Sequence, residues 1–173
     1  MSVESAMLLA RLVNELGEVT GRKRLQKIVH LLQATGAKDF SYRFILHYFG
    51  PYSKELANDL DFLSDVKILS EHAPVGEGSY KYTVCAEVMG EVNRMSDRDK
   101  GSDKWKKLAL ELKVREVPFL EALSTIVFLS KRGRQGKRLR KEFDRIKPNL
   151  SACFDPAEEF ANLRGFISES STT

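Results

Sequence analysis

The sequence contains little that would place this protein in a membrane, in an oxidising compartment or on a secretion route. It has no run of about 18 apolar residues, so it predicts no membrane-spanning helix. Its two cysteines, Cys85 and Cys153, are far apart, which indicates reduced thiols in a cytoplasmic protein. The first residues include Glu4 and no basic leader before an apolar stretch, so we expect no signal peptide.

Residues typical of catalytic and metal sites are also scarce. The histidines His30, His47 and His72 lie far apart, with no carboxylate or cysteine at the spacing of a metal site. Neither a nucleophile elbow nor a glycine-rich dinucleotide motif occurs. We therefore expect no metal, no cofactor and no enzymatic activity.

The composition is that of a globular protein with an uneven charge distribution. Of 173 residues, 42% are hydrophobic and 30% are charged. A chain of this length buries roughly 70% of its unfolded surface, so it can fold without disulfides or metals. Residues 1–96 carry 11 Lys and Arg against 12 Asp and Glu, whereas residues 97–173 carry 17 against 12. The net charge of +4 therefore comes from the second half.

Residues 40–52 contain the clearest local pattern. From Phe40 to Tyr48, aromatic and branched residues alternate with other side chains, which predicts a strand packed mainly on one face. Gly50 and Pro51 follow and should break that strand, since proline cannot donate to a ladder.

The next segment predicts a helix over residues 53–66. Ser53 can cap it by accepting a hydrogen bond from a free backbone N–H. Leu56, Leu60 and Leu63 recur at helical spacing, so one stripe of this helix should be buried.

The flanking segments complete a winged helix-turn-helix over residues 1–96. Helices are predicted at 5–16 and 22–33, and a hairpin, the wing, at 68–72 and 80–84. A short helix at 86–95 and the polar segment 96–103 follow, and we place a boundary there. Residues 97–173 predict a basic helical region packed on the first domain, with helices at 105–112, 117–131 and 134–147. Asp155 and Pro156 should begin a last helix as cap and first residue. The fold class is mainly α with a small antiparallel sheet.

The chain resembles a known family over most of its length, and the resemblance returns weakly at Leu123–Leu129 and at Lys147-Pro148. The segments Gly21–Gln33, Phe40–Phe44 and His47–Leu56 are similar to those of the YwgA-like winged-helix proteins of bacteria and archaea. The block Gly50-Pro51-Tyr52-Ser53 is the most specific part. A looser likeness, confined to the helix with Leu25-Gln26-Lys27, is to SocA-like (Panacea) antitoxin domains. The YwgA-like resemblance implies a winged-helix fold and little about activity.

Two clusters in the first domain offer contacts to phosphate, the main source of affinity in nucleic-acid binding. One is the start of the second helix, with Arg22, Lys23, Arg24 and Lys27. Cations there oppose the helix dipole, so either phosphate or an acidic group of the protein itself would compensate them. The other is Ser53 and Lys54 at the start of the next helix.

The strongest polyanion signal lies in the second half. A run of eleven positions contains seven Lys and Arg and no acidic residue: Lys131, Arg132, Arg134, Lys137, Arg138, Arg140 and Lys141. Such a run either contacts nucleic acid or forms a solvated surface.

The outward face of the helix at 53–66 suits DNA poorly. With the leucine stripe inward, one positive and three negative residues point outward along with Asn58 and Phe62: Lys54, Glu55, Asn58, Asp61, Phe62 and Asp65. Phosphates would repel this face. An exposed Phe62 within an acidic rim would suit a protein contact, whereas the alternative is a solvated face with Phe62 partly buried.

Two functions follow from these features. The first is a winged-helix nucleic-acid-binding protein, a DNA-binding regulator of transcription. The second is a protein-interaction module, such as an antitoxin-like partner or an accessory subunit of a larger complex. A homodimer stays open, since helix-turn-helix proteins commonly pair to read two half-sites.

Overall fold

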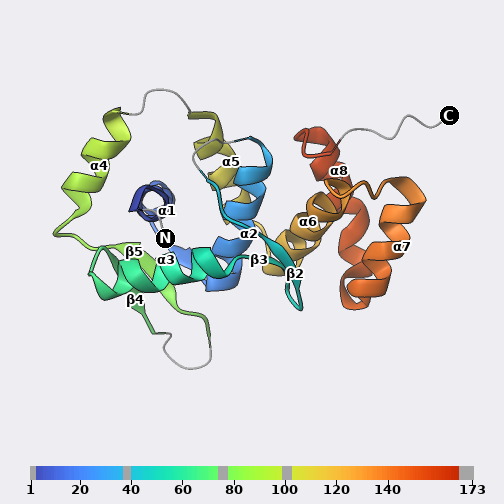
Figure 1. Ribbon diagram of the computed structural model, residues 1–173, viewed down its shortest axis with the longest axis horizontal. Coiled ribbons are helices and arrows are strands. Elements are labelled where there is room, and N and C mark those ends of the chain that lie inside the picture. The colour runs from blue at the N-terminus through green and yellow to red at the C-terminus, as the bar shows by residue number, and fades with distance from the viewer. Residues whose placement is uncertain (1–2, 37–39, 74–77, 99–102, 168–173) are drawn as a thin grey trace.

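The chain is mainly helical and carries two small antiparallel sheets (Figure 1). A computed structural model describes residues 3–36, 40–73, 78–98 and 103–167. The helices are α1 (Val3–Leu16), α2 (Arg22–Ala34), α3 (Lys54–Asp65), α4 (Met89–Arg98), α5 (Asp103–Lys113), α6 (Val117–Ser130), α7 (Gly136–Ile146), the 3-10 helix η1 (Pro148–Cys153) and α8 (Phe154–Leu163). The strands are β1 (Val19–Thr20), β2 (Ile45–His47), β3 (Gly50–Tyr52), β4 (Leu69–His72) and β5 (Lys81–Val84). The predicted fold class is confirmed, and within the described ranges no helix has the length and apolar character needed to cross a membrane.

The larger sheet has the strand order β1–β5–β4, with all pairs antiparallel. Strand β5 lies in the middle and pairs Tyr82 with Val19 of β1, and Val84 with Leu69 of β4. The hairpin predicted at 68–72 and 80–84 is therefore confirmed. Part of its connecting loop, residues 74–77, lies outside the described residues.

The strand predicted over Phe40–Tyr48 is wrong for most of its length. Phe40 and Tyr42 are buried as the alternation indicated, but only Ile45–His47 forms a strand. The reason is that a side chain of α2 makes the backbone hydrogen bonds that a neighbouring strand would otherwise make. The Gln33 side chain donates to Tyr42 O at 2.8 Å and accepts from Tyr42 N at 2.9 Å.

Gly50 and Pro51 do not end the strand segment as predicted. They form β3, which pairs with β2 across a turn at Tyr48 and Phe49, and Leu46 lies opposite Pro51. Gly50 supplies a φ of 79°, which favours glycine, and Pro51 tolerates this short two-stranded sheet because its missing N–H faces no further strand.

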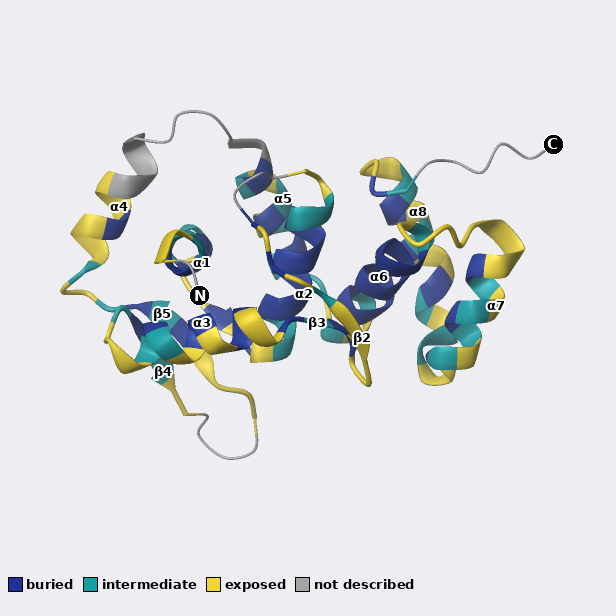
Figure 2. Ribbon diagram, in the orientation of Figure 1, coloured by how far each residue is buried: buried dark blue, intermediate teal, exposed yellow. Residues whose placement is uncertain are grey.

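Helix α6 lies at the centre of the second half. It packs against α2 and β3 on one side and against α7, η1 and α8 on the other, and Figure 2 shows it almost entirely buried. This confirms the helix predicted at 117–131. Helix α5 packs against α1 and α2, and a single hydrophobic cluster includes residues from both sides of position 96. The division into domains 1–96 and 97–173 stays a prediction.

The start of the last helix differs from the prediction. Helix α8 begins at Phe154, and Cys153 holds the N-cap position without a side-chain hydrogen bond. Asp155 therefore does not cap the helix, because η1 runs directly into α8; its carboxylate instead lies 2.8 Å from Arg140 Nη1. The short helix predicted at 86–95 is observed as α4, shifted towards the C-terminus. Residues 99–102 of the predicted boundary lie outside the described residues.

Candidate nucleic-acid interface

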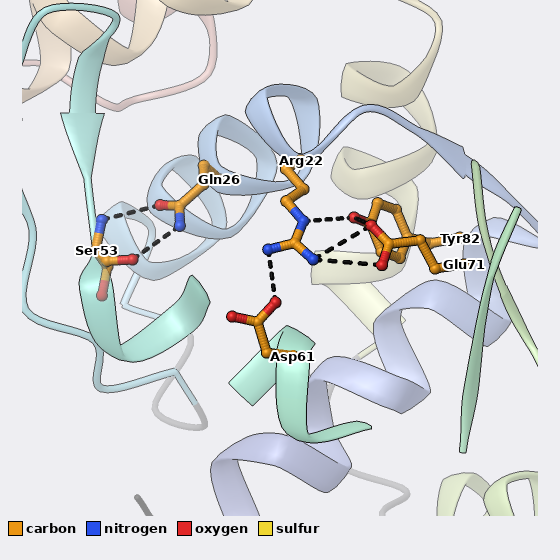
Figure 3. A network of polar contacts seen from close by, with 6 residues as sticks. All are labelled: Arg22, Gln26, Ser53, Asp61, Glu71 and Tyr82. Atoms are coloured by element: carbon orange, nitrogen blue, oxygen red, sulfur yellow. Dashed lines mark hydrogen bonds and ion pairs between the residues drawn. The ribbon is translucent and has the colours of Figure 1, made fainter. Parts of the chain in front are cut away.

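Arg22, the first residue of α2, makes contacts within the protein (Figure 3). Its guanidinium donates to Tyr82 Oη at 2.6 Å and pairs with Asp61 of α3 at 2.6 Å and with Glu71 of β4 at 3.2 Å. Partial burial lowers the pKa of Arg22, but its hydrogen bonds with Tyr82 and Asp61 outweigh this and hold that pKa above the usual value. Arg22 thus ties α2 to α3 and to the larger sheet.

Arg24 and Lys27 also have internal partners. Arg24 Nη1 donates to the carbonyls of Lys113, at 2.6 Å, and Arg115, which lie at and just after the end of α5. Lys27 is only 2% exposed, and its Nζ donates to Pro51 O at 2.6 Å. Lys23 differs, since its ammonium lies 3.6 Å from the centre of the Phe49 ring beside open cavities. The four predicted cations therefore do not form one phosphate-binding surface.

The start of α3 is fixed by two hydrogen-bonding side chains. Ser53 Oγ accepts from Leu56 N at 3.2 Å, so the predicted cap is confirmed. Gln26 of α2 donates to Ser53 O at 2.8 Å and accepts from Ser53 N at 2.9 Å (Figure 3). Ser53 is completely buried, so its hydroxyl serves the helix and not an outside ligand, whereas Lys54 is exposed.

The outward face of α3 is acidic but only partly free. Asp61 pairs with Arg22, and Glu55 accepts a hydrogen bond from Arg43 N at 2.9 Å. Phe62 is half-buried and packs against the hydrophobic core, which matches the alternative in which Phe62 is partly buried. The structure leaves Asn58 and Asp65 exposed.

The basic run of residues 131–141, here called the α6–α7 segment, spans the loop after α6 and the first turns of α7. Gly133, with a φ of 82°, ends the helical turn and lets Arg134 N donate to Leu129 O at 3.1 Å. Three of the seven cations have partners. Lys131 donates to Ala34 O at 2.7 Å, Arg132 lies 3.9 Å from the Phe128 ring centre, and Arg140 pairs with Asp144 and Asp155.

The other four cations of this segment are exposed: Arg134, Lys137, Arg138 and Lys141. Within the described ranges none of them has a carboxylate within ion-pair distance. Glu142 of α7 pairs with Arg145 at 2.7 Å, and this hydrogen bond lowers the pKa of Glu142. The positive charge of Arg134 also lowers the pKa of Glu142, without an ion pair between them. The α6–α7 segment is therefore the part of the predicted interface whose charge the protein does not neutralise.

Sequence analysis missed one surface feature, the β2–β3 hairpin of residues 45–52. The alternating pattern indicated that Leu46 and Tyr48 are buried, yet both are exposed, as are Ile45 and Phe49 beside them. A cavity of about 820 Å³ lies against the turn and a second of about 360 Å³ lies beside it. The aromatic pair directly before Gly50 was the available signal, because it occupies a turn and not a strand.

Comparison with known proteins finds a similarity to a bacterial protein. No family model matches the chain, and no solved structure matches it. The chain is similar to the Uncharacterized protein YwgA of Bacillus subtilis (strain 168). The two are 27% identical over 120 residues, which cover 69% of this chain and 71% of the relative. This agrees with the resemblance to YwgA-like proteins and assigns no activity.

Proposed function

We propose that this protein is a winged-helix nucleic-acid-binding protein, a DNA-binding regulator, that holds phosphate through the α6–α7 segment. The observation that carries the proposal is the set of four exposed cations at residues 134–141 that have no carboxylate within ion-pair distance among the described residues. A surface cation that neutralises a phosphate releases the counterion condensed on it, and this release contributes to the binding affinity. The order α1–β1–α2–β2–β3–α3–β4–β5, with β1 paired to β5 of the wing hairpin, supports the winged-helix part of the proposal.

Helix α3 is not the reader in this proposal, although it follows α2 as a recognition helix would. Its outward face carries Glu55, Asp61 and Asp65 against Lys54, and its position is fixed by Arg22 and Gln26. An acidic helix would pay a repulsive cost between two rows of phosphate. The basic second half instead provides the anchor.

Charge reversal in the α6–α7 segment tests the proposal. We expect Lys137→Glu/Lys141→Glu to weaken binding to a fluorescein-labelled DNA duplex and to reduce the slope of log K against log salt by about 2, since each lost phosphate contact removes about 0.9. Fluorescence anisotropy over a salt series measures both quantities.

The matched control is Lys67→Glu/Lys107→Glu, which changes the net charge equally at two exposed lysines outside the segment. If control and test variants weaken binding to the same extent, the effect is one of net charge and the segment is not the anchor. Absence of salt-sensitive binding by the wild-type protein to DNA of any form contradicts the proposal as a whole.

A protein-interaction module, antitoxin-like or an accessory subunit, is the second candidate. The observation that favours it is the acidic outward face of α3, where Asn58 and Asp65 are exposed and the net charge repels phosphate. In this case Asn58→Arg/Asp65→Arg should abolish retention of a partner while leaving DNA binding unchanged. Light scattering would show whether the partner is a second copy, since one chain has a mass of 19.6 kDa.

A further inference from the structure

The β2–β3 hairpin displays aromatic side chains at a rigidly held turn. Tyr48 is 79% exposed and Phe49 is 47% exposed, and their rings meet edge to face with centres 4.9 Å apart. Exposed aromatic pairs of this kind are uncommon on a surface that has no partner, because burial of an aromatic ring is favourable.

The backbone of the hairpin is anchored from both sides. Lys147, just after α7, donates from Nζ to Tyr48 O and to Glu121 at 2.7 Å, and Lys27 of α2 donates to Pro51 O. A Cβ on Gly50 would lie 2.9 Å from Thr125 Oγ1, so the turn approaches α6 as closely as glycine allows. The hairpin is thus a preorganised platform, and its ligands need not order it on binding.

The cavities beside the turn have cationic walls. The 820 Å³ cavity is lined by Tyr48, Phe49, Lys23 and Lys147 among others, and the 360 Å³ cavity continues past Phe49 to Lys27. Glu121 is the acidic residue among the described lining residues, and Lys147 neutralises it. The aromatic rings therefore lie next to the ammonium group of Lys23, and this combination suits a ligand with planar rings and negative charge.

We propose that the β2–β3 hairpin binds unpaired bases of single-stranded nucleic acid, with Tyr48 and Phe49 stacking on bases and Lys23 contacting phosphate. This inference rests on the proposed nucleic-acid binding and names the strand form that the protein prefers. Single-strand binders combine a cationic groove with aromatic side chains on which bases stack. Bases within a duplex stack on one another and are not available to an exposed ring.

The two proposed contact regions lie at opposite ends of α7. The α6–α7 segment includes the first turns of α7. At the other end of α7, Ile146 and the following Lys147 line the larger cavity. Eleven residues of helix span about 16 Å. One strand of ordinary site length can therefore reach both regions.

The test compares labelled 20-nucleotide poly(dT) with a 20-base-pair duplex in anisotropy titrations of three variants. We expect Tyr48→Ala to weaken poly(dT) binding at least about fivefold and to leave duplex binding unchanged. Tyr48→Trp should restore the affinity and show quenched indole emission on binding. Tyr80→Ala, which removes another exposed tyrosine on the wing hairpin, is the matched control and should change neither affinity.

The outcomes separate the two proposals. If Tyr48→Ala leaves poly(dT) binding intact while Lys137→Glu/Lys141→Glu removes it, the hairpin inference is wrong and the proposed function stands. If wild-type protein binds neither probe at low salt, both proposals are wrong. Equal weakening on poly(dT) and on duplex would also overturn the single-strand inference.

Discussion

Lys27 places an ammonium group in the interior, beside Pro51 O, and this gives the protein a specific pH dependence. Burial lowers the pKa of Lys27 from 10.5 to about 7, and the charge of Lys147 lowers it as well, while Glu121 raises it. Between pH 7 and pH 10.5 the unfolded chain therefore binds more protons at this residue than the folded chain does. Lys27 should make the free energy of unfolding rise with pH across that window.

Lys27→Met removes this contribution. We expect the stability of the wild-type protein relative to the variant to increase from pH 6.5 to pH 9.5, because below pH 7 the folded protein must bury a charged lysine. Urea unfolding curves at several pH values measure the difference. Lys107→Met, at an exposed lysine, should run parallel to wild type, and a parallel profile for Lys27→Met would contradict the assignment.

Residue identity alone predicted some sites well. Ser53 as a helix cap and the buried leucines of α3 follow from local spacing, and both are observed. The partners of Arg22, Arg24 and Lys27 could not be predicted, because they come from segments 24 to 91 positions away. Helix dipoles indicated that these cations need compensation, and only the fold shows that carbonyls and carboxylates of the protein supply it.

At the scale of elements, α2 holds the segment that follows it through two glutamines. Gln26 and Gln33 are two helical turns apart on one face, and each makes a pair of hydrogen bonds with one backbone residue, Ser53 or Tyr42. Each side-chain amide therefore donates to a backbone carbonyl and accepts from a backbone N–H, as a neighbouring strand would. This arrangement explains why residues 40–44 alternate in burial without forming a sheet.

Replacing either glutamine should destabilise the fold. We expect Gln26→Met to lower the free energy of unfolding by about 1–3 kcal/mol for each backbone group left buried and unpaired, and Gln33→Met to do so less, since Tyr42 backbone is only part-buried. Chemical denaturation followed by circular dichroism measures both. Gln135→Met, at an exposed position without a side-chain cap bond, is the control and should change stability by about 0.5 kcal/mol or less. Equal losses of stability at all three positions would show that the hydrogen bonds of Gln26 and Gln33 to the backbone do not stabilise the fold.

At the scale of the whole molecule, one buried ion pair joins the hairpin to the second half. Lys147 Nζ lies 2.7 Å from Glu121 Oε1, and both residues are over nine-tenths buried. Removing one partner of such a pair leaves an uncompensated charge in the interior. The pair therefore connects the position of the hairpin to that of α6 and η1.

A double-mutant cycle tests this connection. We expect Lys147→Met to cost about 3–5 kcal/mol, and Lys147→Met/Glu121→Met to cost less than the two single changes together. Urea unfolding of the four proteins gives the coupling energy. If the two single changes in the free energy of unfolding are additive, the two groups stabilise the fold independently, although they lie only 2.7 Å apart.

The sequence by itself determined the helices, the wing hairpin and the location of positive charge, because apolar periodicity, caps and composition are local properties. Tertiary structure decided which cations remain available and which aromatic residues face solvent. Arg22, Arg24 and Lys27 of α2 are held by partners far along the chain, whereas four exposed cations of the α6–α7 segment have no carboxylate within ion-pair distance among the described residues. The Tyr48–Phe49 turn is exposed because side chains, and not a longer strand, hold the backbone around it. Gln33 hydrogen-bonds to Tyr42, and the buried Lys147 donates to Tyr48 O.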